Sequence, residues 1–220
     1  MSATLGVVML DTRFPRPRGD IGNAQTFAFP VHYRTVASAS PRRVVIERDP
    51  ALLAPFIDAA RALEREGVAA VTTSCGFLAL FQREMAAALA VPMWTSSLLL
   101  VAEIEAGWRD GRRVGVVTAD AASLTAEHLR AVGARTDTPI EGLAVDSRFR
   151  RTLLEDRAEL DLAEAEQATV AAVVLECTNL PPYADAVRAA TGLPVHDITT
   201  LVRARLAGVA TVATVGNAAA

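Results

Sequence analysis

Cys75 and Cys177 are the only thiols in this chain of 220 residues, and they occupy matching positions of an internal repeat. When the chain is displaced by 102 residues, Val68-Ala69-Ala70-Val71 falls on Val170-Ala171-Ala172-Val173, and Cys75 falls on Cys177. A duplicated unit with one thiol in each half predicts two thiols that face a common cleft. That geometry suits work on opposite faces of one small substrate.

Each cysteine stands where an apolar strand gives way to a helix, in Val-Thr-Thr-Ser-Cys75 and in Val-Leu-Glu-Cys177. At a helix N-terminus, the unpaired backbone N–H groups and the positive end of the helix dipole favour thiolate over thiol. The same N–H groups can hold a carboxylate. A single cysteine in such a place is more often a small buried apolar residue, but the matched pair favours a base or nucleophile in each half.

The composition restricts the classes of protein that fit. The chain is 51% hydrophobic and 21% charged, with a formal net charge of −3. It lacks the basic surplus that phosphate-backbone binding needs, so we expect a small-molecule carboxylate as partner and no nucleic acid.

We expect a cytoplasmic protein without membrane contact. The apolar run Leu5–Leu10 lacks the basic start and cleavage site of a signal peptide and is interpreted as a first strand. Glu103 and Glu105 interrupt a later apolar run well short of a membrane span. In a reducing compartment the cysteines are expected to be free thiols.

Neither a metal nor a cofactor is predicted. The three histidines, His32, His128 and His196, form no cluster with zinc-ligand spacing, and there is no CxxC pair.

Short β-branched runs alternate with longer Ala/Leu/Glu/Arg stretches, as in βα units on a parallel sheet. The strands are predicted at Leu5–Leu10, Tyr33–Ala37, Val68–Thr73, Val91–Trp94, Arg113–Thr118, Ile140–Val145, Ala171–Glu176 and Leu193–His196. The helices are predicted at Pro50–Glu66, Phe77–Leu89, Ser97–Gly107, Ser123–Val132, Arg150–Thr169, Pro182–Ala190 and Thr199–Ala207, and Thr211–Ala220 is left unassigned.

The repeat predicts an α/β fold of two pseudo-twofold-related Rossmann-like lobes. Each lobe is expected to hold a parallel four-stranded sheet flanked by helices, with the active site in the cleft between the lobes. The N-terminal lobe is predicted to comprise residues 1–96 and 197–220, with the C-terminal segment crossing back, and the other lobe residues 97–196.

A long connection, Asp11–Pro30, follows the first strand. A stretch of that length without regular structure is usually functional or disordered, and it should lie at the carboxyl edge of the sheet, where open α/β proteins place ligands. Its arginines, Arg13, Arg16 and Arg18, are interpreted as a solvated face. The alternative is a lid that meets an anionic substrate.

Four segments resemble the cofactor-independent aspartate/glutamate racemase superfamily, which also includes hydantoin racemases, maleate isomerases and arylmalonate decarboxylases. They are Asp11 after strand one, Ser-Cys75-Gly, Val-Gly-Val-Val-Thr118 and Glu-Cys177-Thr-Asn. In racemases of this superfamily, one cysteine thiolate removes the α-proton and the other returns a proton from the opposite face. The resemblance implies these catalytic roles for Cys75 and Cys177, and a homo-oligomer.

The resemblance also implies a set of substrate contacts. Neutral donors at the positions where the superfamily binds carboxylate or enolate oxygens would stabilise the charge that develops as the proton leaves. Asp11 would orient an amino group or a cysteine. His196 would help to bind the substrate or shuttle a proton. Alternatively, Asp11 caps a turn, Thr178 and Asn179 cap the N-terminus of a helix, and His196 has only a structural role. The implied contacts are Asp11, Thr12, Ser74, Gly76, Phe77, Thr118, Thr178, Asn179 and His196.

Two departures bear on the substrate. Amino-acid racemases of the superfamily usually have Asn-Thr after the first cysteine, where this chain has Gly76-Phe77, and glutamate racemases have Thr-His after the second, where it has Thr178-Asn179. Glutamate is therefore not the expected substrate.

The leading hypothesis is a racemase or epimerase of a small carboxylate-bearing substrate, such as an amino acid or a hydantoin, acting by proton transfer between two cysteines. One alternative is a maleate-isomerase-like or decarboxylase-like enzyme with covalent or single-cysteine chemistry. Another is a ligand-binding protein of the same fold without turnover.

Overall fold

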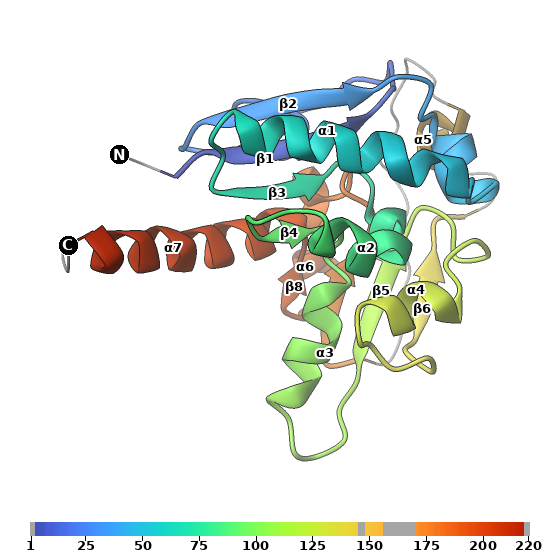
Figure 1. The fold of residues 1–220 in the computed structure, drawn as a ribbon. Helices are drawn as coiled ribbons and strands as arrows, with labels where there is room; N and C mark the ends of the chain where they lie inside the picture. Colours follow the sequence, from blue (N-terminus) through green and yellow to red (C-terminus); the bar gives the residue numbers. More distant parts are fainter. Residues whose placement is uncertain (1–2, 145–147, 156–169, 218–220) are drawn as a thin grey trace.

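The computed structural model describes residues 3–144, 148–155 and 170–217, and within them it contains two parallel four-stranded sheets (Figure 1). The first has the strand order β2-β1-β3-β4 and the second β6-β5-β7-β8. The first-sheet strands are β1 (Leu5–Leu10), β2 (Val31–Val36), β3 (Ala70–Thr73) and β4 (Met93–Trp94). The second-sheet strands are β5 (Val114–Thr118), β6 (Ile140–Gly142), β7 (Ala172–Leu175) and β8 (Val195–His196).

The two sheets repeat one another in strand order and in register. Leu5 of β1 pairs with Ala70 of β3 in the first sheet, and Val114 of β5 pairs with Ala172 of β7 in the second. These are equivalent positions of the internal repeat. The predicted α/β class, with two pseudo-twofold-related lobes, is therefore confirmed.

Helices and short helical turns connect the strands. The α-helices are α1 (Leu53–Arg65), α2 (Gln82–Ala87), α3 (Leu99–Ala106), α4 (Ala126–Ala131), α5 (Arg148–Glu155), α6 (Ala184–Thr191) and α7 (Ile198–Asn217). The shorter turns are the π-helical η1 (Arg42–Ile46) and the 3₁₀ helices η2 (Pro50–Leu52), η3 (Gly76–Phe81) and η4 (Pro181–Tyr183).

Several predicted elements differ in extent from those observed. The helix expected over 77–89 is divided into η3 and α2, since its first turn closes by a bond from the Leu78 N–H to the Cys75 carbonyl, three residues back. The helix expected over 150–169 is observed as α5, and residues 156–169 lie outside the described residues. The strand expected over 140–145 is observed as β6, which ends at Gly142, and residue 145 lies outside the described residues. Helix α7 extends to Asn217, ten residues beyond its expected end.

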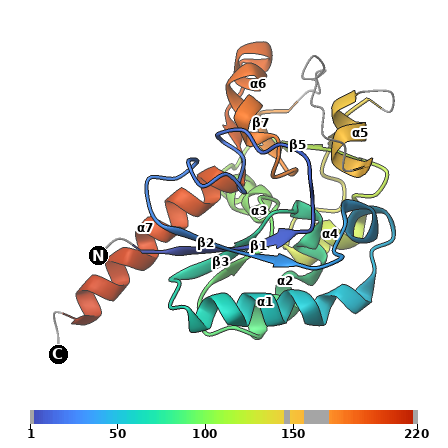
Figure 2. The same cartoon turned by 90° about the horizontal axis from the view of Figure 1, so that it is seen from above.

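Helices α1 and α7 cover opposite faces of the first sheet (Figure 2). Successive side chains of a strand point to opposite faces, so Val8 and Leu10 pack in the cluster that contains α1. On the other face, Leu5 and Val7 share a cluster with Leu201 of α7. The C-terminal helix thus lies on the sheet formed by residues 5–94, and the lobe boundaries at 96/97 and 196/197 stay a prediction.

The lobes share one hydrophobic core. The cluster that holds Val8 and Val71 of the first sheet also holds Val114, Val116 and Val174 of the second. Strands β1, β3 and β7 are buried at every residue, as expected of parallel strands covered on both faces. The loops that follow these strands are therefore held in fixed positions relative to one another.

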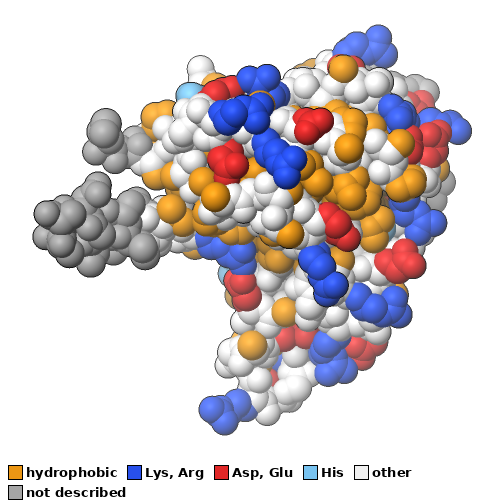
Figure 3. Space-filling model, in the orientation of Figure 1, with side chains coloured by type: hydrophobic (Ala, Val, Ile, Leu, Met, Phe, Trp, Pro, Cys, Tyr) orange, Lys and Arg blue, Asp and Glu red, His pale blue; other side chains and the backbone are white. Residues whose placement is uncertain are grey.

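The face shown in Figure 3 carries basic and acidic side chains interspersed, without a patch of one sign. Within the part of the chain that the structure describes, no helix is long and apolar enough to cross a membrane.

Candidate active site

Cys75 and Cys177 line the same pocket, which has a volume of about 380 Å³ including the part open to solvent. Cys75 follows β3 and Cys177 follows β7, and each is only 8% exposed. Both are free thiols. The other lining residues come from both lobes and from the 11–30 connection: Leu10, Phe14, Pro41, Val45, Ser74, Gly76, Phe77, Ala119, Leu153, Leu154, Glu176, Thr178 and Asn179.

The two cysteine loops cross at this pocket in a pseudo-symmetric way. The Thr178 hydroxyl, one residue after the second cysteine, donates to the Ser74 carbonyl, one residue before the first, at 2.6 Å. The repeat-equivalent crossing brings Glu176 against Gly76, where a Cβ atom would overlap both the Glu176 carboxylate and its main-chain oxygen. Glycine at 76 is thus what lets the Glu176 side chain enter the site.

Glu176 is a fully buried carboxyl. Its Oε2 accepts a hydrogen bond of 2.7 Å from the Thr118 hydroxyl, while its Oε1 has no hydrogen-bond partner within the described residues. Burial raises the pKa of Glu176 to about 7, against a lowering effect of the Thr118 hydrogen bond. Near neutral pH this group therefore exchanges between its neutral and charged forms.

Both thiols have raised pKa values, against the expectation that the helix N-termini favour thiolate. Burial, followed by the negative charge of Glu176, raises the pKa of Cys75 to about 12 and that of Cys177 well above its usual value. The N–H groups of Phe77 and Leu78 lower the pKa of Cys75, as does the charge of Arg16. The predicted direction of the backbone effect is present, but desolvation outweighs it.

The two thiols differ in their surroundings. The Cys177 Sγ donates to the Asn179 Oδ1 at 3.6 Å, which holds it as a thiol, and Asp20 adds a negative charge that raises its pKa. Cys75 instead has the positive charge of Arg16 acting on it. Cys75 is therefore the better placed of the two to act as a base.

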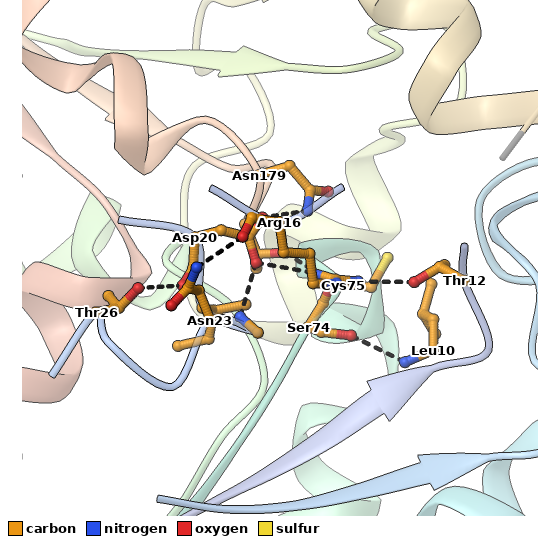
Figure 4. Close-up of polar contacts among 12 residues, drawn as sticks. Leu10, Thr12, Arg16, Asp20, Asn23, Thr26, Ser74, Cys75 and Asn179 are labelled. Atoms are coloured by element: carbon orange, nitrogen blue, oxygen red, sulfur yellow. Dashed lines mark hydrogen bonds and ion pairs between the residues drawn. The ribbon is translucent and has the colours of Figure 1, made fainter. Parts of the chain in front are cut away.

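The 11–30 connection closes over the cysteines through a buried ion pair (Figure 4). Arg16 donates to the Asp20 carboxylate at 2.9 Å and to the Thr12 hydroxyl at 2.9 Å, and Asn179 donates to the other Asp20 oxygen at 2.6 Å. The Arg16 side chain is only 12% exposed. Arg13 and Arg18 are exposed, so the interpretation as a solvated face fails for Arg16 alone.

The structure brings six of the implied substrate contacts to the site or its immediate support. Five of them line the pocket: Ser74, Gly76, Phe77, Thr178 and Asn179. The sixth, Thr118, donates a hydrogen bond to the Glu176 carboxyl.

The other three implied contacts lie outside the pocket lining. Thr12 accepts from Arg16, and the exposed Asp11 carboxylate accepts from the Ser38 N–H at 3.0 Å. His196 is partly buried at the end of β8, and burial lowers its pKa. A direct role in substrate binding for these three residues stays a prediction.

Sequence reasoning missed Glu176 and Asp20, and it named Arg16 only in the alternative of a lid. A signal for Glu176 was available, because a carboxylate that ends the buried run Val-Val-Leu-Glu next to a cysteine is costly unless it is used. No sequence signal marked the inward positions of Arg16 and Asp20, because only the geometry of the loop turns these side chains inward. No group of three or more metal-ligating side chains is found among the residues described.

No protein-family model matches the chain. Among solved structures, a glycine-to-cysteine mutant of arylmalonate decarboxylase is similar with a TM-score of 0.58 and 17% identity, covering 93% of both chains. An aspartate racemase homologue from Pyrococcus horikoshii OT3 has a TM-score of 0.52 and 14% identity, covering 96% of this chain and all of that one. The chain therefore shares the fold of these two proteins.

Relatives that are similar in sequence identify the family to which the chain belongs. The chain is 31% identical over 214 residues to a dimethylsulfoniopropionate lyase from Durusdinium sp. clade D, covering 89% of this chain and 71% of that protein. Dimethylsulfoniopropionate lyase 3 from Emiliania huxleyi is 31% identical over 228 residues, covering 93% of this chain and 59% of its own length. The chain belongs to the dimethylsulfoniopropionate lyase family.

Proposed function

We propose that this protein is a lyase that removes the α-proton of a short carboxylate and expels a leaving group from the β-carbon, with dimethylsulfoniopropionate or a close analogue as substrate. The observation that carries the proposal is the small pocket lined by Cys75, the better placed base, in a chain whose relatives bear that lyase name. A racemase and such a lyase share the first step, which is proton removal next to a carboxylate.

Elimination needs one base and one departing group. The Cys75 thiolate takes the proton from C2, the C–H electron pair forms the C2=C3 double bond, and the C3–S bond breaks. Dimethyl sulfide departs with the electrons of that bond, acrylate remains, and the Cys75 thiol returns its proton to solvent. Cys177, held as a thiol by Asn179, lies on the same pocket as a neutral S–H donor.

The substrate itself favours the active form of the base. A sulfonium group carries a positive charge, and a positive charge close to a thiol lowers its pKa. Phe14 and Phe77 line the pocket together with Leu10 and Leu153, and aromatic faces attract a cation while aliphatic groups contact its methyl groups. The thiolate is therefore formed mainly in the complex, which is consistent with the raised pKa of Cys75.

The second candidate remains a racemase or epimerase. It is favoured by one specific observation, that both thiols line the pocket, whereas a one-base elimination requires only one of them. The two candidates differ in whether C2 is reprotonated or a double bond is formed.

The test is to incubate the protein with dimethylsulfoniopropionate in deuterated water. Release of dimethyl sulfide is followed by gas chromatography, and acrylate and deuterium at C2 by NMR. We expect stoichiometric dimethyl sulfide and acrylate, a loss of at least about 10³-fold in kcat for Cys75→Ala, and a smaller loss for Cys177→Ala.

Other outcomes overturn the proposal. Deuterium at the α-carbon of amino acids or hydantoins, without elimination from any sulfonium substrate, assigns the protein to the racemases. Thermal stabilisation by these compounds without either reaction identifies a binding protein.

A further inference from the structure

Three of the side-chain donors that could hold a substrate carboxylate already donate within the protein. Thr178 donates to the Ser74 carbonyl, Asn179 to Asp20, and Thr118 to Glu176. Arg16 is neutralised by Asp20. A further donor within the pocket would therefore strengthen the binding of an anionic substrate.

Glu176 Oε1 is the unengaged polar atom at this position. Glu176 lines the pocket, and its Oε1 is buried and has no hydrogen-bond partner in the described parts of the chain. A buried polar atom without a partner costs about 1–3 kcal/mol, and such atoms call for an explanation when they occur in a native site. Thr118 donates to Oε2, so in the neutral acid the proton resides on Oε1.

We propose that Glu176 works as a neutral acid whose Oε1–H donates a hydrogen bond to the substrate carboxylate, and that it strengthens this bond as negative charge moves onto the carboxylate during proton removal at C2. This proposal rests on the proposed function. A preorganised neutral donor aimed at developing negative charge stabilises a transition state without a cost of reorganisation.

The charges around the pocket agree with a neutral Glu176. Those that act on the two thiols come from Glu176, from Arg16 and Asp20 of the 11–30 connection, and from Cys75 on Cys177. A charged Glu176 would repel the substrate carboxylate and raises the pKa of both thiols. A neutral one removes both effects, so the proton that binds the carboxylate also eases formation of the Cys75 thiolate.

The pH dependence of binding follows directly. The pKa of Glu176 is about 7, so above that pH most of this carboxyl is ionised. A carboxylate that binds only to the neutral acid is then bound together with the uptake of one proton. Its Kd then rises about tenfold for each pH unit above 7, and is constant below it.

The first test measures binding without catalysis, with propionate as the probe. Titration calorimetry in buffers of different ionisation enthalpy gives the number of protons taken up on binding. We expect uptake approaching one proton at pH 8 and close to none at pH 5.5 in the wild-type protein, and none at either pH in Glu176→Gln, which keeps a neutral donor. Equal uptake in the two proteins, or no uptake at pH 8, overturns the proposal.

The second test uses turnover and two matched variants. We expect the KM of the wild type to rise above pH 7 and that of Glu176→Gln to stay constant. Glu64→Gln is the control and should keep the pH dependence of the wild-type KM, because Glu64 lies away from the pocket, where it accepts from the Ala90 and Val91 N–H groups. Thr118→Val, which removes the hydrogen bond that lowers the pKa of Glu176, should move the rise in KM to higher pH.

The outcomes separate the two proposals. Proton uptake with propionate but no elimination from any sulfonium substrate leaves the role of Glu176 intact and overturns the lyase. Elimination with a pH-dependent KM that persists in Glu176→Gln leaves the lyase intact and overturns the role of Glu176.

Discussion

The absence of a side chain at Gly76 is required by the second lobe, whose Glu176 carboxyl occupies the space that a Cβ would take. We expect Gly76→Ala to lower the free energy of unfolding by about 1–3 kcal/mol, as overpacking of a filled site does, and to displace Glu176 with a loss of at least about tenfold in kcat/KM. Urea unfolding and the elimination assay measure the two effects.

Gly107→Ala is the matched control for that substitution. Gly107 ends α3 at a φ of −76°, and the nearest atom to a Cβ there lies 3.4 Å away. Little change in stability or activity is expected. Equal losses in both variants would contradict the assigned role of Gly76.

Glu176 also makes stability depend on pH. Its pKa is raised from 4.5 to about 7 in the fold, so the folded state holds the proton more tightly than the unfolded state. The resulting contribution, about 3 kcal/mol, is fully present below pH 4.5 and is lost as the pH rises through 7. We expect the difference in unfolding free energy between wild type and Glu176→Gln to change by this amount between pH 4.5 and 8, measured by urea unfolding. A pH-independent difference would show that Glu176 titrates normally.

At the scale of elements, the connection between β1 and β2 depends on one buried carboxylate. Asp20 is 1% exposed and accepts from Arg16, Asn179 and the Gly22 N–H. We expect Asp20→Ala to destabilise the protein by about 3 kcal/mol, because it leaves Arg16 without its partner. Faster hydrogen–deuterium exchange across residues 11–30 should accompany the change.

Arg18→Ala provides the comparison, since Arg18 belongs to the same connection and is exposed. Exchange rates in residues 11–30 should then match the wild type. If the two variants behave alike, the connection is not held by Asp20.

The sequence predicted elements well where one local pattern decides the structure. The buried strands β1, β3 and β7 appear as apolar runs, and the repeat register predicted which of them are equivalent. The division of the 77–89 segment into η3 and α2 was not predictable, because the whole segment carries helix-forming residues. The inward position of Asp20 depends on a partner, Asn179, that lies far along the chain.

At the scale of the whole molecule, α7 joins the chain end to the first sheet. Leu201 is fully buried against β1 side chains, and truncation of a buried leucine costs about 2–5 kcal/mol. Because the two lobes share a core cluster, we expect Leu201→Ala to lower the unfolding free energy by that amount in a single cooperative transition, observed by circular dichroism. Ala204→Ser, at an exposed position of α7, is the control, and two separate transitions would show that the lobes unfold independently.

The unequal crossing of the cysteine loops gives the pocket a direction. A fully symmetric frame would offer the two prochiral hydrogens of a CH₂ group to equivalent sulfurs. Here the Glu176 carboxyl stands at the place that the Ser74 hydroxyl occupies in the other repeat. A substrate anchored by its carboxylate at Glu176 therefore presents a single hydrogen to Cys75, so elimination from a singly deuterated CH₂ should be stereospecific although neither the unlabelled substrate nor acrylate contains a stereocentre.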